Sequence, residues 1–488
     1  MEWTREERYR RLEDVDKEDY QKLIEQVEKS TYRQTFHIQP KTGLLNDPNG
    51  FSYYQERYHL FYQWFPLGPV HGVKYWYHVS SKDLVIWRDE GLALEPDSFY
   101  DSHGVFSGSG LVVDDKLHLF YTGNTRTKDW IRIPYQCHAV MNQHGNIRKS
   151  KLPLISDSPK GFTDNFRDPK AFEYQGQYIC LIGSETTDHR GKIVYYKSED
   201  LVNWDYKGTI KTSNYSNSGD VWECPDYFEQ DGQGVLLFSP QGMVAEGENY
   251  RNIFQSGYLM GKPIDFGTGQ FDHQSFKEFD RGFDFYAPQT MEDHLGRRLL
   301  IGWMGLPGVD CVTDRDGWAH CLTLPRELIV ENGHLYQRPV KELEGLRKSH
   351  SHCSGVLNDE MLTLDETYRT YELRISLTVD DLKYFAITLR EGNGEKTIFS
   401  YDYIKERLQL DLTDAGETVT ADYGRTRSCH FQSDRLDIHL FMDESSLEIF
   451  INDGFEVFTS RIYSQIEANN IHIESKGSTA YELDLWKI

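Results

Sequence analysis

Cysteine is scarce in this chain, and its spacing excludes two of its common uses. The seven cysteines are odd in number and scattered, and no two of them form a Cys-x-x-Cys pair. A disulfide framework needs paired cysteines, and a structural zinc site needs closely spaced ligands, so neither is expected. The cysteines are Cys137, Cys180, Cys224, Cys311, Cys321, Cys353 and Cys429.

Long apolar runs and an excess of positive charge are also absent. No apolar run reaches the roughly 18 residues that suggest a membrane span. Residues 1–30 are dense in charge and lack the apolar core of a secretory signal, so we expect a soluble, cytoplasmic protein without a membrane partner. The 53 Lys and Arg residues against 77 Asp and Glu residues give a net charge of −24, which argues against nucleic acid as a partner.

Several well-known chemical motifs are missing as well. The chain has no Gly-x-Ser-x-Gly, no glycine-rich loop ending in Gly-Lys-Ser/Thr, no His-x-x-x-His and no calcium-loop spacing. The sequence therefore gives no indication of a serine hydrolase or of a P-loop nucleotide-binding protein. Neither a metal nor a cofactor is predicted.

A repeat of about 60 residues dominates the first two thirds of the chain. Short apolar runs typical of buried strands begin at positions 58, 117, 178, 235 and 299, which are 59, 61, 57 and 64 residues apart. A second similarity supports the repeat, because the segment from Ser81 to Trp87 recurs in similar form from Ser198 to Trp204. A repeat of this length suits a four-stranded propeller blade. Five repeats predict a five-bladed β-propeller over residues 32–340.

The two ends of the chain differ from the repeats. Residues 1–31 are predicted to form a short helical extension, because Tyr20, Leu23, Ile24 and Val27 make one apolar stripe. Residues 341–352 are polar and are predicted to be a linker. Residues 353–488 alternate apolar and polar residues between turns, which predicts an antiparallel β-sandwich. The fold class is therefore all-β, a propeller followed by a sandwich.

Three acidic motifs recur at nearly the same distance before the repeated strands. Asp47, Asp168 and Glu223 lie 11, 10 and 12 residues before positions 58, 178 and 235. The other two repeats have Ser107 and Tyr286 near this point. If the shared position is the innermost strand of a blade, the three carboxyl groups converge at one end of the central channel.

Converging carboxyl groups shift each other's pKa and so separate an acid from a base. Glycoside hydrolysis needs such a set, with one carboxylate to attack the anomeric carbon and one acid to protonate the leaving oxygen. An inverting glycosidase on a five-bladed propeller would share the arrangement. So would a sugar-binding propeller without catalysis.

The motifs Asn46-Asp47-Pro48-Asn49-Gly50, Phe166-Arg167-Asp168-Pro169 and Glu223-Cys224-Pro225-Asp226 resemble glycoside hydrolase family 32, the invertases and fructan hydrolases. The resemblance runs from about His37 into the sandwich. It implies retaining hydrolysis with Asp47 as nucleophile and Glu223 as acid/base, while Asp168 binds fructose hydroxyls and favours the transition state. The implied substrate-binding residues are Asn46, Gln63, Phe106, Ser107, Arg167, Tyr286 and Trp303.

Two segments depart from the common family pattern. Leu44-Leu45 stands where Trp-Met is frequent, and His71-Gly72-Val73-Lys74-Tyr75-Trp76 lacks an aromatic residue that often lines the pocket. With Trp318–Glu327, this segment resembles the bacterial sucrose-6-phosphate hydrolases of the family. The expected reaction is hydrolysis of sucrose-6-phosphate and of sucrose, with His71 and Lys74 as candidate phosphate ligands. A general invertase or fructan hydrolase is the alternative. A small carbohydrate is the expected partner, and the oligomeric state stays open.

Overall fold

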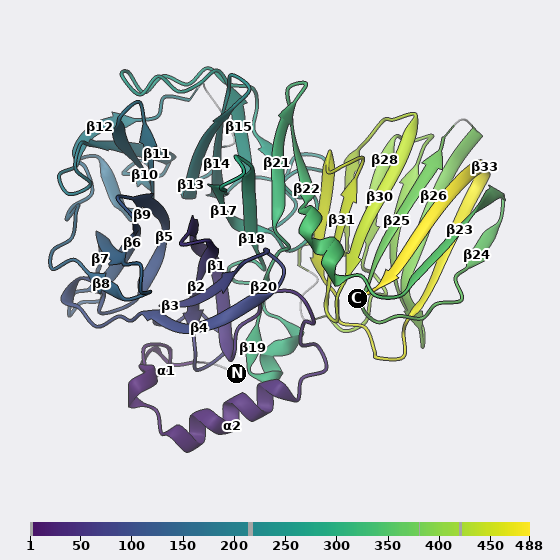
Figure 1. Ribbon diagram of the computed structural model, residues 1–488, viewed down its shortest axis with the longest axis horizontal. Coiled ribbons are helices and arrows are strands. Elements are labelled where there is room, and N and C mark those ends of the chain that lie inside the picture. The colour runs from purple at the N-terminus through teal and green to yellow at the C-terminus, as the bar shows by residue number, and fades with distance from the viewer. Residues whose placement is uncertain (1–2, 213–217, 380, 419–421) are drawn as a thin grey trace.

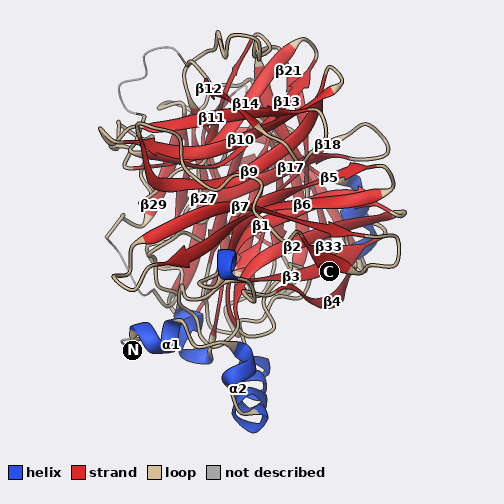
Figure 2. Ribbon diagram, turned by 90° about the vertical axis from the view of Figure 1, so that its left-hand side faces the viewer, coloured by secondary structure: helices blue, strands red, loops and turns tan. Residues whose placement is uncertain are grey.

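The chain folds into a propeller, a β-sandwich beside it and a pair of N-terminal helices (Figure 1). The computed structural model describes residues 3–212, 218–379, 381–418 and 422–488. Strands fill both domains, while α1 and α2 lie together at one end of the molecule (Figure 2). The all-β prediction, a five-bladed propeller followed by a sandwich, is confirmed. Among the described residues, no helix is both long enough and apolar enough to span a membrane.

The propeller consists of five antiparallel sheets, and each begins with its innermost strand. Blade 1 contains β1 (Gly43–Tyr54), β2 (Arg57–Phe65), β3 (Tyr75–Ser81) and β4 (Trp87–Leu94). Blade 2 contains β5 (Val105–Val113), β6 (Lys116–Arg126), β7 (Arg132–Met141) and β8 (Ile147–Lys149). Blade 3 contains β9 (Phe162–Tyr174), β10 (Gln177–Thr186), β11 (Gly191–Ser198) and β12 (Asp205–Thr209). Blade 4 contains β13 (Val221–Gln230), β14 (Gln233–Gln241), β15 (Gly257–Gly261) and β16 (Lys277–Glu278). Blade 5 contains β17 (Tyr286–Glu292), β18 (Arg298–Met304), β21 (Arg326–Glu331) and β22 (His334–Pro339).

The repeated apolar runs form the second strand of every blade, namely β2, β6, β10, β14 and β18. Their residues are almost fully buried because both faces of a blade pack against neighbouring blades. The innermost strands β1, β5, β9, β13 and β17 contact one another in sequence around a closed ring. A further link joins the first and last blades, since β19 (Trp318–Ala319) pairs in parallel with the start of β1. The short β20 (Cys321–Leu322) pairs with β18.

Every innermost strand carries a β-bulge at the motif found in the sequence. Between Leu45 and Pro48, β1 advances three residues while its partner β2 advances two. The same extra residue occurs in β5, β9, β13 and β17, at the motifs containing Ser107, Asp168, Cys224 and Ala287. A bulge bends its strand and redirects a side chain. Four of the five motifs contain proline, which is tolerated at a bulge because the ladder hydrogen bond is already lost there.

The N-terminal segment is helical in three pieces. These are α1 (Arg5–Arg8), the 3-10 helix η1 (Leu12–Asp14) and α2 (Lys17–Glu28). Met1 and Glu2 of the predicted helical extension lie outside the described residues. Val27 of the predicted stripe is buried against Trp318 and Tyr463, so α2 covers the place where β19 closes the propeller. Two other 3-10 helices, η2 (Phe99–Asp101) and η3 (Val312–Asp316), lie in propeller loops.

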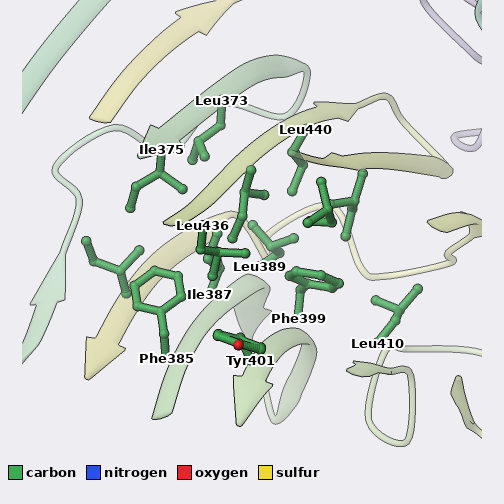
Figure 3. Packing of buried hydrophobic residues seen from close by; sticks show 14 of the residues in the cluster. Leu373, Ile375, Phe385, Ile387, Leu389, Phe399, Tyr401, Leu410, Leu436 and Leu440 are labelled. Atoms are coloured by element: carbon green, nitrogen blue, oxygen red, sulfur yellow. The ribbon is translucent and has the colours of Figure 1, made fainter. Parts of the chain in front are cut away.

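The C-terminal domain is a sandwich whose two layers share one long strand, β33 (Asn470–Lys487). The first half of β33 pairs with β24 and β26, and the second half pairs with β23 and β25. Between the layers, the apolar faces pack into one core (Figure 3). After η4 (Lys341–Leu346), the other strands are β23 (His350–Asn358), β24 (Met361–Thr363), β25 (Tyr371–Thr378), β26 (Asp381–Gly392), β27 (Glu395–Asp402), β28 (Arg407–Asp411), β29 (Thr426–His430), β30 (Arg435–Met442), β31 (Ser446–Ile451) and β32 (Glu456–Arg461).

A buried ionic network joins the two domains. His37 Nδ1 lies 2.8 Å from Asp443 Oδ2, and His37 Nε2 lies 3.0 Å from Glu448 Oε1. Arg326 of the propeller contacts Glu448 at 2.6 Å and Asp280 at 3.1 Å. Burial by itself lowers the pKa of His37, but hydrogen bonds to Asp443 and Glu448 outweigh it and raise the pKa to about 9. His37 is therefore a cation at neutral pH.

Replacing His37 should destabilise the protein in a pH-dependent way. His37→Ala leaves Asp443 and Glu448 with less compensation, which should cost about 3 kcal/mol of unfolding free energy. Because the folded pKa is raised, the histidine's contribution is complete below its ordinary pKa of 6.5 and disappears as the pH rises through about 9. Denaturant unfolding at pH 6 and pH 9.5 measures it. The difference in unfolding free energy between wild type and His37→Ala should be smaller at pH 9.5 than at pH 6, whereas the exposed His144→Ala should match wild type at both pH values. An equal gap at both pH values would contradict a charged His37.

Candidate active site

A cavity of about 420 Å³ opens at one end of the innermost strands. Eleven of the twelve residues predicted from the sequence line it, and the twelfth, Ser107, lies directly behind Asp47. The lining also includes residues that the sequence reasoning missed, namely Tyr9, Gly72, Arg126, Arg132, Asn165, Gln241 and Pro307. The predicted lining residues are Asn46, Asp47, Gln63, His71, Lys74, Phe106, Arg167, Asp168, Glu223, Tyr286 and Trp303.

Asp47 lies on β1 within a set of hydrogen-bond donors. Asn46 Nδ2 donates to Asp47 Oδ1 at 3.1 Å, and Gln63 Nε2 donates to Oδ2 at 3.4 Å. Ser107 Oγ also donates to Oδ2. Burial raises the pKa of Asp47, and the nearby charge of Glu223 adds to this, whereas the hydrogen bond from Ser107 opposes it. These contacts fix the direction in which the carboxylate faces the cavity.

Asp168 occupies the bulge of β9 with left-handed backbone, at φ 66°. Its amide N donates to Thr122 Oγ1 at 2.9 Å, and its carboxylate accepts the amide N–H of Cys224 at 3.0 Å. Burial raises the pKa of Asp168 to about 7, since the charges of Glu223 and Asp47 add to burial and the positive charge of Arg167 only partly opposes it. Asp168 is the acid in this cluster that holds a proton most readily.

Glu223 lies two residues before the proline of its motif, where blade 1 has Asn46 and blade 3 has Arg167, whereas Asp47 and Asp168 directly precede their prolines. The expectation that all three acids share one position therefore holds for the two aspartates, while the glutamate is shifted by one residue. Arg167 donates to Glu223 Oε1 from Nε at 3.0 Å and from Nη2 at 2.8 Å. Tyr286 Oη and Gln241 Nε2 donate to Oε2 at 2.6 Å and 2.5 Å.

The four donors determine the charge state of Glu223 in the free site. Burial alone would raise its pKa, but the charge of Arg167 and the hydrogen bonds from Tyr286, Arg167 and Gln241 outweigh burial and lower it. Glu223 is therefore ionised in the free site, whereas Asp168 is protonated below about pH 7. The three acids thus have separated proton affinities, as acid–base chemistry requires.

Of the two candidate phosphate ligands, Lys74 is deeply buried and His71 is half-buried. Lys74 is 3% exposed, and its Nζ donates to Asn46 Oδ1 at 2.8 Å. Burial lowers the pKa of Lys74 to about 7, although the charge of Asp47 opposes the shift. Burial also lowers the pKa of His71 well below its usual value, so His71 is neutral, and its ring packs edge-on against Trp303 at 5.9 Å. Their role in binding phosphate stays a prediction.

Sequence signals differ among the residues that were missed. Gln241 ends the second strand of blade 4 as Gln63 lies near the end of the second strand of blade 1, so the repeat could have identified it. Asn165 is three residues before Asp168 on the same strand. Tyr9 belongs to the N-terminal segment, where no motif marks it. In the described ranges, no three His, Cys, Asp or Glu side chains form a group suited to hold a metal ion.

Asp168→Asn should stabilise the protein at high pH. Because the folded pKa of Asp168 is raised from 3.8 to about 7, the wild type loses stability as the pH rises from about 4 through 7, and the amide does not. The variant should gain about 2–3 kcal/mol relative to wild type between pH 5 and pH 8. Asn also tolerates the left-handed backbone. Denaturant unfolding at both pH values tests this, with the exposed Asp231→Asn, also at positive φ, as control. A gain that does not change with pH would contradict the raised pKa.

Comparisons with known proteins agree with this geometry. Residues 37–339 match the glycosyl hydrolases family 32 N-terminal domain, and residues 342–487 match the family 32 C-terminal domain. The chain is 45% identical to a sucrose-6-phosphate hydrolase of Staphylococcus xylosus, covering 98% of this chain and 97% of that one. A sucrose-6-phosphate hydrolase structure from Lactobacillus gasseri superposes with a TM-score of 0.93 at 36% identity, covering 100% and 99%. A Bombyx mori family 32 β-fructofuranosidase mutant, in complex with sucrose, superposes with a TM-score of 0.81 at 31% identity, covering 97% and 99%. The chain belongs to glycosyl hydrolase family 32.

Proposed function

We propose that this protein hydrolyses the β-fructofuranosyl bond of sucrose-6-phosphate, and more slowly that of sucrose, with release of fructose. The observation that carries the proposal is the meeting of Asp47, Asp168 and Glu223 in one cavity of a family 32 fold. Full-length similarity to sucrose-6-phosphate hydrolases supports the phosphorylated substrate. Because such a sugar phosphate is an intracellular compound, the proposal implies a cytoplasmic enzyme.

The fructosyl unit would occupy the bottom of the cavity. Asn46, Gln63 and Asp168 present amide and carboxyl groups there, and these groups can hydrogen-bond sugar hydroxyls. Phe106 and Trp303 supply apolar surface for the sugar ring, and Ser107 orients Asp47 from behind. The glucosyl unit, as the leaving group, would lie on the side of Glu223 and Arg167.

The reaction proceeds in two steps. Asp47 attacks C2 of the fructosyl unit while the C2–O glycosidic bond breaks, and Glu223 gives its proton to the glucosyl oxygen. Water then attacks C2, Glu223 takes a proton from that water, and the bond between Asp47 and C2 breaks. Each step inverts C2, so the configuration is retained overall. Arg167 and Tyr286 stabilise the Glu223 carboxylate that the first step produces.

The first step needs a proton on Glu223 and a charge on Asp47. Below about pH 7 Asp168 holds a proton in the free site, because burial and the charges of Glu223 and Asp47 raise its pKa to about 7. The reactive form is the one in which this proton is on Glu223, and the lowered pKa of Glu223 makes it a strong proton donor in that form. Coupled acids of this kind titrate as a unit.

Loss of the shared proton should lower activity on the alkaline side. Since the pKa of Asp168 is raised to about 7, kcat/KM for sucrose should fall about tenfold per pH unit above that value. Sucrose itself does not titrate in this range, so the profile reports the protein. Lys74 also has a pKa of about 7, so Lys74→Met is measured in parallel. The fall in kcat/KM at alkaline pH should persist in Lys74→Met. If that variant shows no such fall, the titrating group is Lys74.

Fructose release from the two sugars is the direct test of function. Wild type should show a kcat/KM for sucrose-6-phosphate at least about tenfold above that for sucrose, which corresponds to about 1.4 kcal/mol of transition-state binding. Asp47→Asn should lose at least about 10³-fold on both sugars, because the amide cannot attack C2. Equal values for the two sugars would identify a general β-fructofuranosidase or fructan hydrolase. Full activity in Asp47→Asn, or an initially inverted product, would contradict the mechanism.

A further inference from the structure

Two arginines form a cationic edge on the cavity that the mechanism does not use. Arg126 ends β6 and Arg132 begins β7, and they face each other as the last register pair of that hairpin. Both line the cavity and are half-buried. Like charges directly opposite each other on a sheet destabilise it. The pair therefore needs another reason to be there.

Both arginines lack a direct carboxylate partner among the described residues. Within the part of the chain that the structure describes, neither forms an ion pair with a carboxylate, and the Nε atom of each is buried without a hydrogen-bond partner. Arg126 Nη1 donates to the carbonyl of Trp130 at 3.0 Å, and Arg132 Nη1 donates to Asn165 Oδ1 at 3.2 Å. Burial and the charges of Arg167 and Arg126 lower the pKa of Arg132, against a smaller opposing effect of Asp164. Two uncompensated cations at one cavity in a chain of net charge −24 indicate a site for an anion.

The arginines lie on the leaving-group side of the cavity. Arg167 donates to Glu223 from two nitrogens, and its Nη1 donates to Asn165 Oδ1 at 2.7 Å. The same Asn165 oxygen accepts the hydrogen bond from Arg132. Glu223 is thus linked through Arg167 and Asn165 to Arg132. A sugar whose glycosidic oxygen meets Glu223 would extend its leaving half towards this edge.

The N-terminal segment holds the edge in place. The guanidinium groups of Arg5 and Arg126 lie 4.3 Å and 5.1 Å from the centre of the Trp130 ring, and Tyr9 packs edge-on against that ring at 5.0 Å. Cation–π contacts of this kind fix the direction of an arginine without neutralising it. Arg126 is therefore preorganised while its charge remains available.

We propose that Arg126 and Arg132 bind the phosphate of the substrate's glucosyl half. The inference rests on the proposed function and deepens it by naming the specificity-determining residues. A guanidinium offers planar, paired donors that match phosphate oxygens, and such charge-assisted bonds are the strong ones. Lys74 differs, because it is already bonded to Asn46 beside Asp47 and so serves the fructosyl side, whichever leaving group is present. His71 is neutral and packed on Trp303.

The test compares two substrates in matched variants. The double variant Arg126→Gln/Arg132→Gln should lower kcat/KM for sucrose-6-phosphate at least about 30-fold and change that for sucrose less than about threefold. Inhibition by glucose-6-phosphate should weaken in parallel, while inhibition by fructose is unchanged. Arg88→Gln, an arginine on β4 with 71% of its side chain exposed, is the matched control and should match wild type on both sugars. Lys74→Met should lower activity on both sugars by a similar factor.

Four outcomes would overturn the inference, and the wild-type substrate preference separates the first of them from the other three. If wild type shows no preference for the phosphorylated sugar, the proposed function itself fails and the inference with it. If wild type has the preference and the double variant keeps it, only the inference fails. If the double variant loses kcat/KM for both sugars by the same factor, the arginines have a structural role. A loss confined to sucrose-6-phosphate in Lys74→Met, without one in the double variant, would assign the phosphate to Lys74.

Discussion

Burial of three carboxyl groups around one cavity costs free energy, and much of the propeller's inner surface is organised around that cost. Burial raises the pKa of Asp168 and of Asp47, and the charge of Glu223 raises both further. The compensation comes from neighbouring blades: Arg167 pairs with Glu223, and Ser107 donates to Asp47. The closed ring of innermost strands is what brings these groups together.

The repeat allowed the fold to be predicted from the sequence. The second strand of each blade is buried on both faces, so it appears in the sequence as an apolar run at a regular interval. The acids could be assigned to innermost strands for the same reason, since their distance to those runs is nearly constant. The bulges could not be predicted. Asp-Pro and Cys-Pro pairs normally indicate turns, and only the pairing register shows that these prolines lie inside strands. The distance from an acid to its apolar run varies by up to two residues among the blades. Counting along the sequence therefore could not show that Glu223 lies one residue earlier in its motif than the two aspartates do.

Other features depend on contacts between distant parts of the chain and left no pattern. The edge formed by Arg126 and Arg132 is a hairpin pair whose importance depends on Asn165 and on the contact of Tyr9, from the N-terminal segment, with Trp130 of the hairpin loop. The network of His37 with Asp443 and Glu448 links residues about 400 positions apart. A single sequence contains no local signal for either. His71 and Lys74 stood out because their segment departs from a family pattern, which says nothing about their depth.

The order of synthesis determines when the long-range strand pairings can form. β1 emerges early, but β19, which pairs with the edge of β1 opposite β2, comes only with residues 318–319. The two sandwich layers lack their shared strand until residues 470–487 have been made. His37, near the start, finds its partners only when that second domain exists. During synthesis the nascent chain therefore carries open strand edges in both domains, which are the places where another polypeptide or a chaperone can pair with it.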